Sequence, residues 1–92
     1  MQPQDVPYLP RGVRTQFDQL RQVEVLLGPE RVLILDQVGE AVLKRLDGTT
    51  NLRGISQALS GVYDAPLDVI EPDVIAFVQD LREKGMVHVQ PN

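Results

Sequence analysis

One change of hydrophobic period decides the fold of this chain, and it falls in residues 31–46, RVLILDQVGEAVLKRL. After Arg31, a short apolar run extends from Val32 to Leu35 and is typical of a strand. After Asp36 the apolar residues recur at i, i+3, i+4 and i+8, which is one helical face: Val38, Ala41, Val42 and Leu46. Asp36 can cap this helix and Gly48 can stop it. The segment therefore predicts a strand over residues 31–35 that leads directly into a helix.

Two further strands are predicted before this segment. From Val13 to Asp18, less polar and more polar side chains alternate along the chain. From Gln22 to Leu27, one face carries Val23, Val25 and Leu27. Residues 18–21 can turn, and Gly28-Pro29-Glu30 is a clear turn signal. Three short strands joined by such turns predict an antiparallel meander.

Two further helices are predicted after the segment. One begins near Asn51, with apolar residues at helical spacing: Leu52, Ile55, Leu59 and Val62. The other is predicted over residues 72–84, because proline is tolerated at the first helical position and Gly85 is well placed as a C-terminal cap. Its apolar face consists of Val74, Phe77, Val78 and Leu81. Residues 67–71 could form a preceding helical turn, and residues 86–90 could add a last strand.

This order of elements predicts an α+β fold that is winged helix-turn-helix-like, a three-stranded antiparallel sheet followed by three helices. Prolines at positions 3, 7 and 10 resist helix and sheet, so residues 1–10 are expected to form a flexible or extended N-terminal arm. Residues 11–92 are expected to form a single domain with this winged-helix-like fold. With no secretory signal and no run of about 20 apolar residues, the expected location is cytoplasmic, without membrane contact.

The residues that carry most enzyme chemistry are scarce. There is no cysteine, and His88 is the single histidine, with no Cys, Asp or Glu at a recognised ligand spacing. The 13 acidic residues are scattered over predicted turns and polar faces. No glycine run resembles a phosphate-binding loop. We therefore predict no catalytic residues, no metal site and no cofactor, and we expect that the chain is not an enzyme.

Charge argues against nucleic acid as a partner. The formal net charge is −4, whereas nucleic-acid binders usually show a basic footprint. The predicted third helix carries three acidic residues against two basic ones, so it should repel phosphates: Asp73, Asp80 and Glu83 against Arg82 and Lys84. A winged-helix domain that binds DNA or acts as a protein adaptor remains the alternative function.

The apolar run at residues 32–35 is the most informative candidate for function. Val32 and Ile34 lie on one face of the strand, and Leu33 and Leu35 on the other, so neither face is polar. One interpretation is a strand buried on both sides. The other is a sheet edge beside an apolar groove, where unpaired backbone groups would accept an incoming peptide strand. The residues alone leave both interpretations open.

Several short motifs, in order, resemble one family, PqqD, the pyrroloquinoline quinone (PQQ) biosynthesis protein D. Near the N-terminus they are Arg11-Gly12-Val13-Arg14, Phe17-Asp18 and the stretch from Val25 to Val32, followed by Leu35-Asp36. Further along they are Leu46-Asp47-Gly48, Tyr63 with Ala65-Pro66, Asp73-Val74, Leu81 and Lys84-Gly85. The resemblance spans about residues 8–86, although Pro72 is unusual for the family at the start of its helix.

The resemblance implies a peptide chaperone with a winged-helix-like fold. Such a protein would bind the PqqA precursor peptide and present it to PqqE, a radical S-adenosylmethionine (SAM) enzyme whose clusters and cofactor belong to that partner. The peptide would add to the third strand, at Arg31, Val32, Leu33, Ile34 and Leu35, and lie against the third helix, at Val74, Val78, Leu81 and Arg82. Arg31 or Arg82 could pair with acidic peptide residues. A homodimer formed by strand or arm exchange is also possible.

Overall fold

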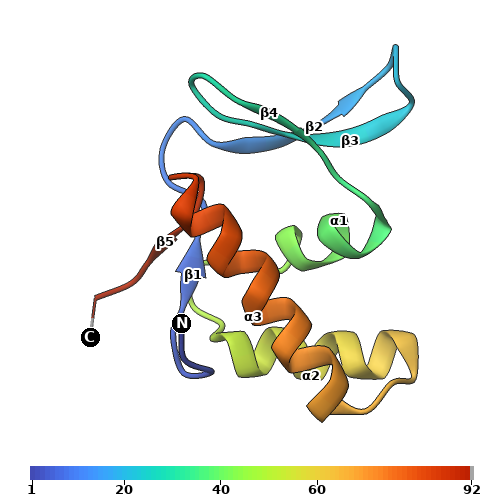
Figure 1. The fold of residues 1–92 in the computed structure, drawn as a ribbon, viewed down its shortest axis with the longest axis vertical. Helices are drawn as coiled ribbons and strands as arrows, with labels where there is room; N and C mark the ends of the chain where they lie inside the picture. Colours follow the sequence, from blue (N-terminus) through green and yellow to red (C-terminus); the bar gives the residue numbers. More distant parts are fainter. Residues whose placement is uncertain (92) are drawn as a thin grey trace.

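A three-stranded antiparallel sheet lies across one end of a cluster of three helices in the computed structural model, which describes residues 1–91 (Figure 1). The sheet has the order β2-β3-β4, with strands Arg14–Asp18, Val23–Leu27 and Val32–Ile34. The helices are α1 (Gln37–Leu43), α2 (Leu52–Tyr63) and α3 (Leu67–Glu83). The predicted α+β arrangement of three strands followed by three helices is therefore confirmed.

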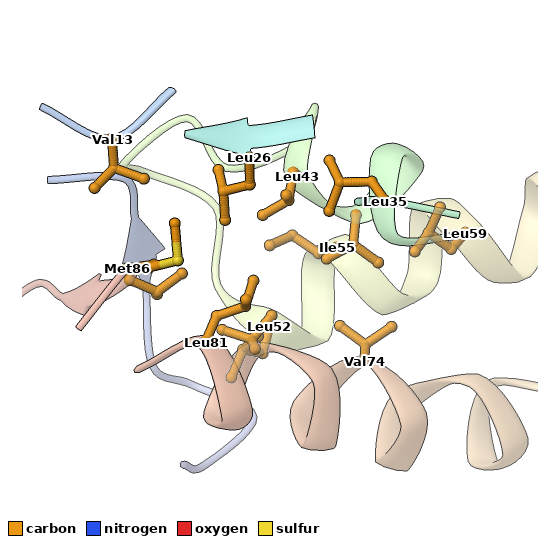
Figure 2. Close-up of a cluster of buried hydrophobic side chains, with 13 residues drawn as sticks. Val13, Leu26, Leu35, Leu43, Leu52, Ile55, Leu59, Val74, Leu81 and Met86 are labelled. Carbon is orange, nitrogen blue, oxygen red and sulfur yellow. The ribbon is translucent and has the colours of Figure 1, made fainter. Parts of the chain in front are cut away.

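The core joins the inner face of the sheet to all three helices. Leu26, at the centre of the sheet, faces Leu43 and Ile55, and Leu52, Val74 and Leu81 line the opposite side of the cluster (Figure 2). Aliphatic side chains fill this core, as the low aromatic content requires. Ser56 is the one buried polar residue among the described residues, and its hydroxyl donates to the carbonyl oxygen of Leu52 over 2.7 Å.

The third helix is longer than its sequence predicts. It begins at Leu67 rather than at Pro72, so the prolyl residue lies inside the helix, where it cannot donate a backbone hydrogen bond. The predicted cap at Gly85 is confirmed, because this residue adopts a φ of +78°. The N–H of Gly85 donates to Arg82 and that of Met86 to Leu81, the paired bonds of a Schellman motif. Met86 and Leu81 are both buried, which completes the cap with an apolar contact.

Pro72→Ala is expected to raise the free energy of unfolding by about 1–3 kcal/mol, because it restores an interior helical hydrogen bond and removes a ring clash. Urea unfolding followed by circular dichroism measures the change. Pro66→Ala is the control, since Pro66 precedes the helix. Its replacement only increases the conformational entropy of the unfolded chain, which should lower the free energy of unfolding by up to about 1 kcal/mol. An unchanged or lowered stability of the Pro72 variant would contradict the interpretation.

The first helix is shorter than predicted. It ends at Leu43 instead of continuing to Gly48, and tighter turns follow, in which Arg45 N–H donates to Val42 and Leu46 N–H donates to Leu43. Leu46 still packs against the core, so its apolar spacing came from packing and not from a continuous helix.

The N-terminal segment makes specific backbone contacts that the proline content did not predict. β1 (Pro7–Tyr8) pairs antiparallel with β5 (His88–Val89), the weakly predicted last strand. The carbonyl oxygens of Pro3 and Asp5 accept from the N–H groups of Arg53 and Leu52, at the start of α2. Residues 1–10 are therefore extended but joined to the domain in this structure, and the boundary at residue 10 stays a prediction.

Within residues 1–91, the structure contains no helix of the length and apolar character that crossing a membrane demands.

Candidate peptide-binding site

β4 is an edge strand with one free side. It pairs only with β3, in the register Val25 with Ile34, Leu26 with Leu33 and Leu27 with Val32. Beyond the two ends of this ladder, Leu35 N–H donates to Glu24 and Gly28 N–H donates to Arg31. Antiparallel pairs alternate between bonded and non-bonded, so Leu33 is the residue of β4 that bonds to β3. The N–H and C=O groups of Val32 and Ile34 consequently point away from the sheet, toward the free side.

The side chains of β4 alternate between two environments. Leu33 is half-buried against the core, and Leu35 just beyond the strand is part of the core. Val32 and Ile34 lie on the outer face of the sheet with 57% and 63% of their surface exposed. Both interpretations of the apolar run are thus partly correct, because one face is packed and the other is open. An apolar surface with free backbone groups beside it is what an incoming strand requires.

The opposite edge of the sheet, at β2, is less suited to strand addition. Arg14 and Asp18 stand at its two ends, and charged residues on an edge strand disfavour pairing with another chain. Val32, Leu33 and Ile34 include no charge and no proline. The free side of β4 is therefore the better candidate for a guest strand.

The helical residues named from the family resemblance differ in how far they are exposed. Val74, Val78 and Leu81 are buried in the core, and of the three only Val74 also lines a pocket. Arg82 is exposed, but it lies two residues from both Asp80 and Lys84, which is about 200° around a helix. It therefore points away from the face of α3 that carries those two residues.

Another stripe of α3 lines pockets shared with residues that precede and follow β4. Its residues recur at i, i+4, i+7 and i+11, which is one helical face: Asp73, Phe77, Asp80 and Lys84. Lys84 Nζ lies 2.6 Å from a carboxylate oxygen of Asp80. This stripe was not predicted from the sequence, where Phe77 falls on the apolar face with the core residues and the charged residues have the pattern of a solvated face. The amphipathic spacing next to the core face was the available signal.

Two pockets lie between this stripe and the residues that flank β4, one before the strand and one after it. The one at the start of β4, here called the turn pocket, is lined by residues 28–31 and 84–86, which include Arg31 and Lys84. The one past the end of β4, here called the helix pocket, has a volume of about 230 Å³ between α1, α2 and α3. The turn before β4 thus shares a pocket with the end of α3, and Asp36 after β4 shares one with the middle of α3, so the two segments run in opposite directions.

The helix pocket has an apolar floor and an acidic mouth. Buried residues form the floor: Val42, Leu59 and Val74. More exposed residues surround the opening, among them Asp36, Val38, Tyr63 and Asp73. The Phe77 ring lies on α1 at Gly39, where a Cβ atom would come within 3.1 Å of it, so this close approach of α1 and α3 requires glycine or a shift of the ring.

Asp36 also has a structural role. Its Oδ1 atom accepts from the N–H of Gly39 over 2.7 Å, which caps α1 as the sequence predicts. Asp36→Ala is expected to lower the free energy of unfolding by about 1 kcal/mol, whereas Asp36→Asn should change it little, since asparagine caps as well as aspartate. Thermal and urea unfolding of both variants measure this difference. Equal loss in the two variants would show that the carboxylate charge, and not the cap, supplies the stability.

Together, the fold and the strand edge define a class, that of small winged-helix-like α+β domains with one open strand edge beside a helix. The sequence model described as coenzyme PQQ synthesis protein D (PqqD) matches residues 24–87. The chain belongs to the PqqD family.

Curated relatives cover most of this chain. PqqA binding proteins of Bradyrhizobium diazoefficiens and Xanthomonas oryzae are 41% and 42% identical, over 88% and 90% of this chain and 79% and 90% of their own lengths. The bifunctional coenzyme PQQ synthesis protein C/D of Methylorubrum extorquens is 46% identical over 90% of this chain, which spans only 22% of that protein.

Two solved structures are similar. The solution structure of the PqqD part of PqqCD from Methylobacterium extorquens, described as a stand-alone recognition element for ribosomally synthesised and post-translationally modified peptides, is 42% identical with a TM-score of 0.83. It covers 95% of this chain and 93% of its own. The crystal structure of PqqD from Xanthomonas campestris is 41% identical with a TM-score of 0.59, and covers 92% of this chain and 94% of its own.

Proposed function

We propose that this chain is a peptide chaperone of PQQ biosynthesis that binds the PqqA precursor peptide as an added strand on β4. The observation that carries the proposal is the free edge, where Val32 and Ile34 have outward backbone groups and exposed side chains. Relatives covering most of the chain are named for PqqA binding, which supports the choice of peptide.

Main-chain pairing supplies the general affinity in this mechanism. Val32 and Ile34 offer two donors and two acceptors, and each hydrogen bond contributes about 0.5–1.5 kcal/mol net. Along residues 31–35, the peptide then contacts the backbone groups of Val32 and Ile34. It also contacts the exposed side chains of these two residues on the outer face of the sheet. Leu33 and Leu35 hold the strand on the core. Arg31 of the turn pocket is free to pair with an acidic peptide residue.

On the helical side we assign the contacts to the stripe that lines the two pockets. Phe77 and Lys84 line the helix pocket and the turn pocket, and both are at least partly exposed. Val78 and Leu81 then act indirectly, because their packing on the core sets the position of α3, whereas Val74 also lines the helix pocket. Arg82 is left outside the peptide path.

We also propose that the chain presents the bound peptide to PqqE and catalyses no step itself. The relatives are named as binding proteins, which agrees with this division of roles. No three His, Asp or Glu side chains of residues 1–91 gather in a way that could hold a metal ion. A pull-down of PqqE with the chain, with and without PqqA, tests presentation, and failure to recover PqqE in both conditions would refute it.

Hydrogen exchange tests strand addition directly. In the free protein the amides of Val32 and Ile34 should exchange quickly and that of Leu33 slowly, because only Leu33 bonds to β3. PqqA should slow exchange at Val32 and Ile34 and shift the amide resonances of the α3 stripe. Binding without protection of these two amides would place the peptide elsewhere.

A homodimer formed by arm exchange is a further part of the proposal. β1 pairs with β5 over two residues only, and such a short pairing can be remade between chains. Size-exclusion chromatography with light scattering over a range of concentrations tests it. A single monomer mass throughout would exclude the exchange under those conditions.

A further inference from the structure

The lining of the helix pocket is unusual for a purely apolar site. Two of the four aromatic residues of the chain, Tyr63 and Phe77, line it together with Asp36 and Asp73, and no Lys, Arg or His residue is among the lining. Neither carboxylate takes part in an ion pair with any residue between 1 and 91. The mouth of the pocket is therefore negatively charged and not neutralised from within the domain.

This combination favours one kind of side chain. Uncompensated carboxylates attract a cation, and aromatic rings add to that attraction when the cation lies over their faces. The floor formed by Val42, Leu59 and Val74 suits methylene groups and not a hydrated ion. The volume of about 230 Å³ is nearly eight times the ~30 Å³ share of one water molecule in the liquid, which is room for a long side chain.

The position of the pocket connects it to the strand edge. Asp36 follows Ile34 by two residues, which is about 7 Å along an extended chain. A guest strand paired with Ile34 therefore has its next residues beside the pocket mouth. A side chain directed toward α3 from there can enter between Asp36 and Asp73.

We infer that the helix pocket is a specificity site for a lysine or arginine side chain of the guest peptide. Its methylene stem lies on the apolar floor and its charged head lies at the two carboxylates, as long basic side chains do when an apolar surface has a polar rim. This inference rests on the proposed strand addition. It adds that the guest peptide needs a basic residue at one position, and that this residue fixes the register of the guest strand on β4.

The charge requirement is tested with a double neutralisation, Asp36→Asn with Asp73→Asn. Asparagine keeps the cap on α1, so the fold is retained. Affinity for a synthetic PqqA peptide should fall on the order of tenfold at low salt, and by less at high salt. The matched control, Asp68→Asn with Glu83→Gln, removes the same charge from α3 outside the pocket and should change affinity less than about twofold. Equal losses in the two double variants would overturn the inference.

A peptide series locates the partner of the carboxylates. Each Lys or Arg of the synthetic PqqA peptide is replaced in turn by norleucine, which keeps an apolar stem without charge. At one position, the norleucine replacement should lower affinity as much as the double neutralisation of Asp36 and Asp73 does. When this peptide is bound to the double variant, the two losses of affinity should not add. Full additivity at every basic position would overturn the inference.

Steric blocking provides a readout that does not depend on charge. Val38, at the pocket mouth, and Val62, outside it, are similarly exposed, at 51% and 61%. Val38→Trp should weaken binding about tenfold, and Val62→Trp should leave it unchanged. If strand addition to β4 is wrong, PqqA will not protect Val32 and Ile34. If only the pocket assignment is wrong, that protection will persist and both tryptophan variants will bind normally.

Discussion

Ile34→Pro is expected to remove most of the affinity for PqqA while the domain stays folded. The N–H of Ile34 points toward the free side of β4, so its loss breaks no bond to β3. Proline is tolerated on an edge strand in this orientation. For the guest strand, the ring removes one donor, leaves a peptide carbonyl unpaired and obstructs close approach. The cost is at least about 2 kcal/mol, which is roughly a 30-fold rise in Kd.

Fluorescence anisotropy or calorimetry with PqqA measures this loss, and thermal unfolding confirms the fold. Ile34→Thr is the matched control, because threonine keeps the β-branch and the N–H and changes only the side chain. It should cost a fraction of the proline effect. If both variants lose the same affinity, side-chain burial and not main-chain pairing drives binding. Unaltered binding by the proline variant would rule out strand addition at this edge.

The choice of Ile34 depends on the structure. A proline at Leu33 would instead remove an N–H that bonds β4 to β3. Such a variant would lose binding through loss of the strand, and the result could not separate folding from recognition.

Leu26→Ala is expected to have the largest effect on stability, a loss of about 2–5 kcal/mol in the free energy of unfolding. Leu26 is 0% exposed and lies between the sheet and the helices, so truncation leaves a cavity that the neighbouring strands cannot fill (Figure 2). The total free energy of unfolding of small domains is about 5–15 kcal/mol, so the substitution would remove a large fraction of it. Urea unfolding at fixed temperature measures the change.

Leu20→Ala is the control for this truncation, because it removes the same atoms from a side chain that is 97% exposed, in the turn between β2 and β3. Its effect should stay within about 0.5 kcal/mol. A small effect at Leu26 would mean that the sheet packs on the helices less tightly than the structure describes. Binding of PqqA by the folded fraction of the Leu26 variant should be unchanged.

The elements with strong local signals were predictable. Alternation predicted β2 and β3, the 3.6-residue period predicted α2, and Asp36 and Gly85 were identified as the caps of α1 and α3. The start of α3 was predicted wrongly, because local preference places Pro72 at a first turn. Packing of the helix on the core overrode that preference, with Pro72 itself exposed to solvent.

The strand half of the candidate site was predictable and the helical half was not. The apolar run at residues 32–35 is recognisable in the sequence, because it lacks the alternation of apolar and polar residues expected of a half-buried strand. On α3, the buried Val78 and the pocket-lining Phe77 are neighbours in the chain and similar in polarity. Which of them lines the pocket depends on the rotation of the helix on the core, which is the sum of many contacts.

Periodicity, caps and turn residues act over a few neighbouring positions, so the order of strands and helices, the family resemblance and the candidate strand at residues 31–35 could all be read from the sequence. The position of β4 at an edge, the free backbone groups of Val32 and Ile34, and the meeting of Asp36 and Asp73 at one pocket became evident only in the folded structure. These features join residues far apart in the chain, and the packing of α3 against α1 and the sheet brings them together.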